Sequence, residues 1–595
     1  MATTRKVVRA TPGGVGSGED AIDGAAPGGD DKGIVAATRV VALCTVASKV
    51  TGLVREVLLT SLFGIGPVMD AFAYACVVPA YFQMVAGGFN GPFHTAVLVA
   101  ARRRRKVSVE EAPTLKTLVS TKHLVESLSS WAVLPASLIA CALFFFPGPV
   151  LGLFAPGLAS PGPDGLLELS IATQQLRIMA PCVLTGVLTG IAFGGLNAAG
   201  HFLSPSISQA LANAMMVCGI IAMRGLSGGL SALSSGRQLA TAFLMGSVVQ
   251  LLLQSIVMQK KGVGALFRPR LRLSDLGVVA HAARILLPAI LSSTMLQLST
   301  YTDLWFASSW QGSAAVMACA AMITTAPIGL LGSAIIVPRM PRLAQQAADS
   351  DWQGFRMACD SMLRTSISVG LPLTISFCFF AKQIVSSVYE RSAFTSDSTA
   401  QVVPVVVVYA LGIAWFICRD VVVRAFYALD RGKIPVITSV AALVLNAVLD
   451  AYLSRTMASP AVGLVFSTVL VSCLSTVALY WALHKILRDK VGPAGSALGG
   501  LKWRKFLLNT LCASGITMCH SKWLLHKFPT LQSLLKSSFH FSSAWRLETL
   551  GLSVGWLLDA SLVGASLVSA WAVYYLCLAA CDKMGSGTPK DLPSH

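Results

Sequence analysis

The stretch that decides the fold is SKVTGLVREVLLTSLFGIGPVMD, residues 48–70. It is hydrophobic enough to cross a membrane, yet it contains Lys49, Arg55 and Glu56, and Asp70 follows a glycine-rich turn. A charged side chain at the bilayer centre costs about 2.5–3.5 kcal/mol, so such residues normally face a bundle interior or a water-filled cavity. The stretch therefore predicts a membrane helix that presents cations to an internal cavity, where they would bind an anion.

The composition of the whole chain agrees with a membrane protein. Of its 595 residues, 54% are hydrophobic and 12% are charged, and the mean hydropathy is +0.68. Soluble domains carry about a quarter charged residues, so the chain is expected to cross a membrane many times. The 14 cysteines are scattered through hydrophobic runs without a CxxC pair, which indicates packing residues rather than a metal or disulfide framework.

Hydrophobic runs of about 20 residues predict an all-α polytopic protein with about fourteen transmembrane helices. A faint repeat, LFAPGLASPGPDG at 153–165 and VYERSAFTSDS at 388–398, divides them into two bundles of about six helices and two extra C-terminal helices. The expected domains are a tail or transit peptide at 1–32, helix bundles at 33–260 and 261–490, the extra helices at 491–582, and a C-terminal tail at 583–595.

The net charge of +19 is carried by short loops between hydrophobic segments, with RRRRK at 102–106 as the densest run. Positively charged loops mark the cytoplasmic side, so both termini are expected there, and nucleic-acid binding is not expected. Residues 1–32 lack the hydrophobic core of a secretory signal. They fit either a disordered tail, with the protein in the plasma membrane, or a transit peptide, which would place it in the chloroplast envelope.

Several polar residues inside the hydrophobic runs are candidate site residues. Gly87–Pro92 interrupt the second run, a pattern that breaks a helix and exposes its backbone. Asp303 lies in the seventh run, and Asn446 and Asp450 lie at i and i+4 in the eleventh. These oxygens suit a small hard cation. Asp70 fits either a gate contact to Arg55 or Lys49, or a helix N-cap.

Residues 48–72 resemble the opening helix and first loop of the MurJ/MviN family, the lipid II flippases of the multidrug/oligosaccharidyl-lipid/polysaccharide exporter superfamily. Similar stretches follow in the same order along 34–490, and the cyanobacterial and plastid-lineage branch is the most similar. They are GGFNGPFHTA at 87–96, LNAAGHFLSPSISQALAN at 196–213, PAILSSTMLQLSTYTDLWFAS at 288–308, APIGLLGSAIIVP at 326–338, YERSAFT at 389–395 and FYALDRGKIPV at 426–436.

The resemblance implies a transporter rather than an enzyme, and no nucleophile–base or metal-ligand set contradicts this. It implies two bundles that rock around a cationic cavity, a lipid groove formed by the last two helices, and transport of lipid II for peptidoglycan synthesis. The expected partners are lipid II, membrane lipids and cell-wall synthesis enzymes, and the chain is expected to be a monomer. Two other hypotheses are a small-molecule or drug exporter of the same superfamily and a non-transporting scaffold for cell-wall synthesis.

The resemblance also assigns roles to individual residues. Lys49 and Arg55 match family arginines that meet the pyrophosphate, with lysine at the first position. The other candidate substrate-binding residues are Asp70, Gln83, Asn90 and Arg177. No organic cofactor is expected, but the family implies sodium as a coupling ion. Its ligands would be Asp303, Asn446, Asp450, Val462 and Thr468.

The sequence departs from the better-known bacterial members at two cavity positions. The stretch that ends at Gln83 lacks an expected arginine, and Met322 and Thr325 stand where arginine and glutamate are expected. Arg177, Arg419 and Arg424 could replace the missing charge. Arg419 could instead pair with its neighbour Asp420.

Overall fold

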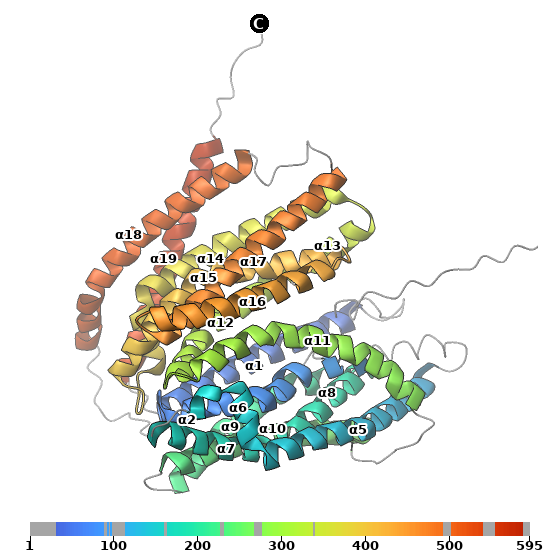
Figure 1. The fold of residues 1–595 in the computed structure, drawn as a ribbon. Coiled ribbons are helices and arrows are strands. Elements are labelled where there is room, and N and C mark those ends of the chain that lie inside the picture. Colours follow the sequence, from blue (N-terminus) through green and yellow to red (C-terminus); the bar gives the residue numbers. More distant parts are fainter. Residues whose placement is uncertain are drawn as a thin grey trace, which may run out of the picture.

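The computed structural model describes residues 31–88, 92–94, 96–97, 113–159, 163–226, 231–266, 276–336, 339–491, 501–538 and 554–586. Within these residues the secondary structure is helical, and the helices form two lobes, one above the other in Figure 1. The chain is an all-α multi-pass integral membrane protein. Eight helices of the described chain are long and hydrophobic enough to cross a membrane, or nine if one bent pair counts as a single span.

The first lobe contains the helices up to residue 260, around a core that includes Leu59, Leu188 and Phe243. The expected second span is broken into short segments, and the fourth is bent by 40° between α7 and α8. The elements are α1 (Asp31–Phe63), α2 (Pro67–Ala75), α3 (Val77–Ala80), the π-helix η1 (Tyr81–Ala86), α5 (Pro113–Phe145), α6 (Pro147–Phe154), the 3₁₀-helix η2 (Pro156–Ala159), α7 (Pro163–Met179), α8 (Cys182–Ala198), α9 (Leu203–Leu226) and α10 (Ala232–Lys260).

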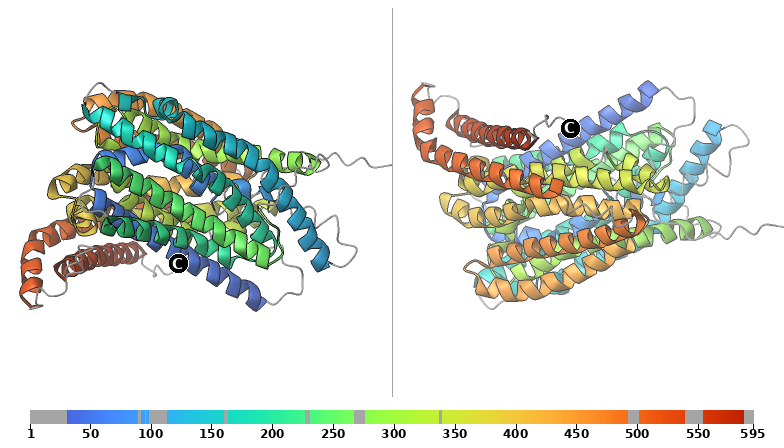
Figure 2. Two further views of the ribbon diagram at one scale, coloured as in Figure 1. Left: turned by 90° about the horizontal axis from the view of Figure 1, so that it is seen from below. Right: turned by 90° about the horizontal axis from the view of Figure 1, so that it is seen from above.

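The second lobe has two hydrophobic cores, one around Phe380 and Val406 and the other around Phe355 and Phe426. The first of these cores also takes in residues of α18 and α19, which pack against α14 at the edge of the molecule (Figures 1 and 2). The elements are α11 (Leu276–Ala307), α12 (Ser313–Ile336), α13 (Met340–Ala348), α14 (Trp352–Tyr389), α15 (Ser396–Ala428), α16 (Lys433–Thr456), α17 (Pro460–Val491), α18 (Leu501–Ser538) and α19 (Val554–Ser586).

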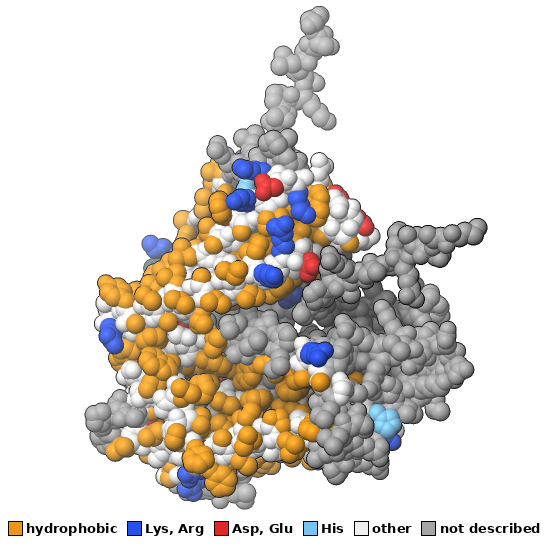
Figure 3. Space-filling view, turned by 45° about the vertical axis from the view of Figure 1, so that its right-hand side comes forward, with side chains coloured by type: hydrophobic (Ala, Val, Ile, Leu, Met, Phe, Trp, Pro, Cys, Tyr) orange, Lys and Arg blue, Asp and Glu red, His pale blue; other side chains and the backbone are white. Residues whose placement is uncertain are grey.

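The outer surface is suited to lipid. Hydrophobic side chains cover much of both lobes on the face in Figure 3, and Lys and Arg side chains gather toward the top of the upper lobe. Leu138, Trp481 and Val568 are 72%, 66% and 70% exposed, which would be costly in water. We call the end of the molecule where α1 ends and α12 begins the closed end. The opposite end, where α10 ends and α14 begins, is the basic end because Lys260, Lys261 and Arg339 lie there.

Candidate functional site

Asp70 of the first lobe binds the start of α12 in the second lobe. Its side chain is 1% exposed. Oδ1 accepts a hydrogen bond from the backbone N–H of Ala315 at 2.7 Å, and Oδ2 accepts one from the N–H of Gly312. These are N–H groups that the α12 hydrogen-bonding pattern leaves free, and the helix dipole favours a carboxylate there. Asp70 therefore caps a helix of the other lobe instead of its own α2, and no hydrogen bond to Lys49 or Arg55 is present.

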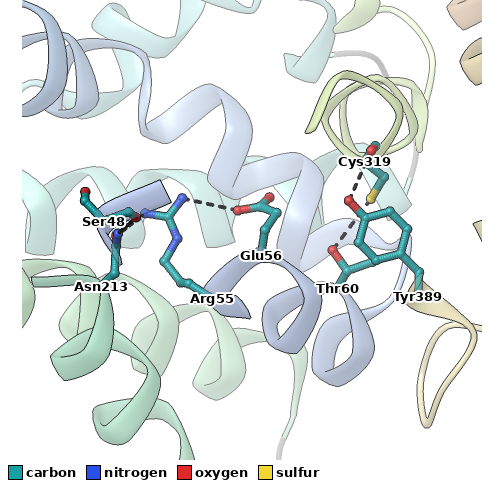
Figure 4. Close-up of polar contacts among 7 residues, drawn as sticks. All are labelled: Ser48, Arg55, Glu56, Thr60, Asn213, Cys319 and Tyr389. Atoms are coloured by element: carbon teal, nitrogen blue, oxygen red, sulfur yellow. Dashed lines mark hydrogen bonds and ion pairs between the residues drawn. The ribbon is translucent and has the colours of Figure 1, made fainter. Parts of the chain in front are cut away.

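Further contacts join the lobes at the closed end. The N–H of Ala393 donates to the Ser61 carbonyl at 3.0 Å, and the N–H of Gly157 donates to the Ser308 hydroxyl at 3.0 Å. Thr60 Oγ1 lies 3.8 Å from Cys319 Sγ, as Figure 4 shows. With Asp70, these contacts fasten both lobes together where α1 ends.

Arg55 is held inside the first lobe. Its Nη1 donates to Asn213 Oδ1 of α9 at 3.0 Å, and its Nη2 lies 3.3 Å from Glu56 Oε2 (Figure 4). Asn213 also donates to the Ser48 carbonyl at 3.4 Å, so one amide links both ends of this α1 segment. The Arg55 and Glu56 side chains are 17% and 15% exposed. The guanidinium is thus positioned, and its charge is balanced by an adjacent carboxylate.

Lys49 lies on a different face of α1 and is exposed. A methyl group added at Gly329 of α12 would lie 4.0 Å from Lys49 Nζ, so the ammonium faces the second lobe. Its neighbours Val50 and Val54 are 54% and 49% exposed. Lys49 and Arg55 are separated by about 120° around an ideal helix, which explains why one faces the other lobe and the other contacts α9.

The broken second span packs on α8 backbone to backbone. A methyl group on Gly87 would lie 2.0 Å from the Gly186 carbonyl oxygen, and one on Gly186 would lie 2.5 Å from the Phe82 carbonyl oxygen. Only glycine allows this approach. The expected break after residue 86 is present, but Asn90 lies outside the described residues.

Gln83 lies inside the first lobe and does not join Lys49 and Arg55. Its side chain is 5% exposed and its Nε2 donates to Gln250 Oε1 of α10 at 2.8 Å. Nearby, His94 Nε2 lies 2.8 Å from Asn197 Nδ2, so this buried histidine has a hydrogen-bond partner. Arg177 is exposed in the last turn of α7, before the bend at Pro181. The structure therefore places these candidates apart from the α1 cations.

The sequence left open whether Arg419 forms an ion pair with its neighbour Asp420. Asp420 pairs instead with Arg424, whose Nε lies 3.1 Å from Asp420 Oδ1. Residues i and i+4 share a helix face, whereas adjacent residues diverge. Arg419 donates to the Ser439 and Ser475 hydroxyls at 3.2 Å each. On α12, Met322 is half-buried and Thr325 is exposed, so neither supplies a cation.

Asp303, Asn446, Asp450 and Thr468 come together between α11, α16 and α17. Asp303, Asn446 and Asp450 are 4%, 0% and 0% exposed. Thr468 donates to Asp303 Oδ2 at 2.8 Å, and Asn446 Nδ2 donates to Asp450 Oδ1 at 3.2 Å. Asp303 Oδ1 and Asp450 Oδ2 are buried without a hydrogen-bond partner. Two buried carboxylates with unused oxygens need a cation or a proton to offset their desolvation.

Other members of this cluster were recognisable only in part from the sequence. Ser467 donates to Asp450, and Ser299 donates to Asn446 Oδ1 at 2.6 Å. Ser299 lies one turn before Asp303, a spacing that could have identified it. Val462 is half-buried on α17, without a side-chain oxygen. Among the described residues there is no group of three or more His, Cys, Asp or Glu side chains that could bind a metal.

Comparisons with known proteins identify the family that the chain resembles. The family model "Lipid II flippase MurJ" matches residues 59–539. The "Probable lipid II flippase MurJ" of Synechocystis sp. is 36% identical over 468 residues, 78% of this chain and 82% of its own length. The "Lipid II flippase MurJ" of Burkholderia cenocepacia is 26% identical over 451 residues, 74% of this chain and 82% of its own length.

Solved structures support the same fold. A structure of "Lipid II flippase MurJ, inward closed conformation" has a TM-score of 0.65 and 18% identity, covering 91% of this chain and 99% of its own. An inward-facing MATE family transporter of the MOP superfamily has a TM-score of 0.56 and 13% identity, covering 74% of this chain and 95% of its own. From the extent of the family match and the identity to the cyanobacterial relative, we conclude that this chain belongs to the lipid II flippase MurJ family.

Proposed function

We propose that this protein is a flippase that moves a polyprenyl-pyrophosphate-linked saccharide, lipid II, across a membrane by alternating access. The observation that carries the proposal is the position of the α1 cations relative to the closed end. Lys49 is exposed and faces α12, while Asp70 joins the lobes at the other end of α1. A headgroup could therefore reach Lys49 from the basic end while the closed end blocks its exit.

The charges support an anionic headgroup. A pyrophosphate cannot cross hydrocarbon without its charges being satisfied, whereas an isoprenoid tail can stay in lipid. Lys49 would provide a mobile point charge. Arg55 would provide a planar guanidinium whose position is fixed by its hydrogen bond to Asn213. A cationic drug would instead favour a first span with an excess of carboxylates, whereas here Lys49 and Arg55 outnumber Glu56, which disfavours the exporter hypothesis. No bond is made or broken in this process, so a transporter needs no catalytic residues.

We also propose that sodium binds to the cluster formed by Asp303, Asn446, Asp450 and Thr468, which we call the Asp303–Asp450 cluster. The fit rests on the two unused carboxylate oxygens, the Asn446 amide and the Thr468 hydroxyl, because sodium prefers oxygen ligands. A bound cation would neutralise the carboxylates and link α11 to α16 and α17. The two carboxylates, the amide and the hydroxyls would orient one another through the hydrogen bonds described above. Sodium binding would thereby stabilise one arrangement of the second lobe.

A growth experiment tests the proposed function. In a bacterium depleted of its own lipid II flippase, we expect the native chain to restore growth and Lys49→Ala/Arg55→Ala to fail at equal membrane abundance. Control cells would carry Arg431→Gln, which removes a cation from the loop after α15. Growth restored equally by the double variant would contradict the cationic site and favour the scaffold hypothesis.

The compartment needs a separate experiment. Residues 1–32 fused to a fluorescent protein would enter chloroplasts if they form a transit peptide, and the flippase would then serve a wall at the plastid envelope. A diffuse cytosolic signal would support the tail hypothesis and a plasma-membrane location.

A further inference from the structure

Arg424 and Asp420 form a charge pair on α15 that is open to solvent. Arg424 Nε lies 3.1 Å from Asp420 Oδ1, and the side chains are 37% and 44% exposed. An ion pair this exposed contributes little to stability. The pair can therefore separate at small cost, and its arginine can bind another anion.

Asp420, the carboxylate of this pair, faces the same surface of α12 as Lys49. A methyl group added at Gly332 would lie 3.9 Å from Asp420 Oδ2, and one added at Gly329 would lie 4.0 Å from Lys49 Nζ. Residues three apart on a helix share a face, with Cβ positions about 5–6 Å apart. Lys49 Nζ and Asp420 Oδ2 are therefore separated by roughly 14 Å at most. No side chain stands at either glycine to block the surface between them.

Arg419, the other arginine in this part of α15, is already engaged. Arg419 donates to Ser439 and Ser475 within the second lobe. On α12 itself, Met322 and Thr325 carry no charge. Arg424, by contrast, is paired with an exposed carboxylate. A stronger anion could displace that carboxylate from Arg424. Its planar fork can bind a phosphate through two parallel hydrogen bonds, which lysine cannot do.

We propose that Arg424 is an anion-binding residue of the second lobe and that Asp420 occupies it when no ligand is bound. A diphosphate entering from the basic end would contact Lys49 and Arg424 across Gly329 and Gly332, and would displace Asp420. This inference rests on the proposed function. Met322 and Thr325 carry no charge, so α12 supplies no cation to the ligand. In this proposal the cation of the second lobe comes from α15 instead.

The two members of the pair should have opposite effects on binding. Removing Arg424 removes an attractive contact, so the affinity for a diphosphate falls. Removing the charge of Asp420 removes a competitor, so the affinity rises. A merely structural role for the pair would make both variants worse. This difference in sign separates ligand binding from folding.

The test measures binding of fluorescent lipid II, and of undecaprenyl diphosphate without saccharide, to the full-length protein in nanodiscs. We expect Arg424→Gln to weaken binding of both lipids about tenfold, and Asp420→Asn to tighten it several-fold. The double variant should behave like Arg424→Gln, and Arg424→Lys should be intermediate. Arg431→Gln, the matched loss of charge in the next loop, should bind like the native protein. Thermal unfolding of each variant would verify that it is folded.

Three results would contradict the inference or the proposed function, and they have different meanings. If the native protein binds lipid II and Arg424→Gln binds it equally well, the role of Arg424 is refuted while the proposed function stands. If Asp420→Asn weakens binding, Asp420 does not compete with the ligand and the inference is also refuted. If the native protein binds neither lipid, the proposed function itself fails.

Discussion

The carboxylate of Asp70 on α2 accepts a hydrogen bond from the backbone N–H of Ala315 on α12 at 2.7 Å, linking the two lobes. A second hydrogen bond comes from Gly312, and the carboxylate is buried. The capping group and the helix it caps belong to different lobes, so separating the lobes at this end breaks the cap. This contact is therefore suited to a gate that would open if the lobes rocked apart, as the proposed alternating access requires.

Replacing Asp70 should loosen the start of α12. A hydrogen bond to a charged group contributes about 1.5–3 kcal/mol, so Asp70→Ala should speed hydrogen exchange of the Ala315 amide by about tenfold or more. Asp70→Asn, which keeps an acceptor, should have a smaller effect. Asp397→Ala, at an exposed aspartate in the first turn of α15, is the matched control. If hydrogen exchange of the Ala315 amide were unchanged in Asp70→Ala, the Asp70 cap would not stabilise the start of α12.

Removing Arg55 should destabilise the first lobe partly through Glu56. The two side chains are 17% and 15% exposed, so Arg55→Gln leaves a partly buried carboxylate without its cation. Arg55→Gln/Glu56→Gln should unfold at a higher temperature than Arg55→Gln alone, with a coupling of about 1 kcal/mol. Lipid II binding should stay impaired in both. If the effects of Arg55→Gln and Glu56→Gln on the free energy of unfolding were simply additive, the ion pair would contribute nothing to stability.

Sodium should stabilise the protein through the Asp303–Asp450 cluster. A ligand at 100 times its dissociation constant stabilises the folded state by about 2.7 kcal/mol. Thermal unfolding should therefore occur at a higher temperature in sodium chloride than in choline chloride of equal ionic strength. Asp303→Asn and Asp450→Asn should abolish the difference, whereas the exposed Asp397→Asn should keep it. A difference that survives in both cluster variants would place the sodium effect elsewhere.

Gly87→Ala should strongly destabilise the first lobe. The added methyl group would lie 2.0 Å from the Gly186 carbonyl oxygen, a backbone atom that cannot rotate away. Overpacking of this kind typically costs about 1–3 kcal/mol or more. The control is Gly152→Ala on α6, where no heavy atom lies within 4 Å of the added methyl. Equal unfolding temperatures for the two variants would contradict the close packing of the second span on α8.

The helices and the grouping of Asp303 with Asn446 and Asp450 were largely accessible from the sequence. Hydropathy identifies membrane helices because every backbone group must be satisfied in lipid. Asn446 and Asp450 could be paired because residues i and i+4 share a helix face. Asp303 was grouped with them because its oxygens suit the same cation, and the structure places Asp303 and Asn446 at Thr468, with Asp450 beside Asn446. The same spacing rule, applied to Asp420, would have selected Arg424 over Arg419.

Other contacts between distant segments were not accessible from the sequence. The Arg55–Asn213 bond spans 158 residues, and no local pattern relates the two positions. Gln83 illustrates a different difficulty, because it lies in the π-helical segment η1. A π-helix changes the number of residues per turn, so a periodicity argument places the following side chains on the wrong face. The break in the helix at Gly87 was predictable from the sequence. The direction in which the Gln83 side chain points was not.

The most direct test of the central claim is translocation of fluorescent lipid II by the purified protein in liposomes, with and without a sodium gradient. We expect the native protein to move lipid II in the presence of the gradient and Lys49→Ala/Arg55→Ala to lose this activity while remaining folded. Absence of movement by folded, correctly inserted native protein, or movement undiminished in the double variant, would contradict the account.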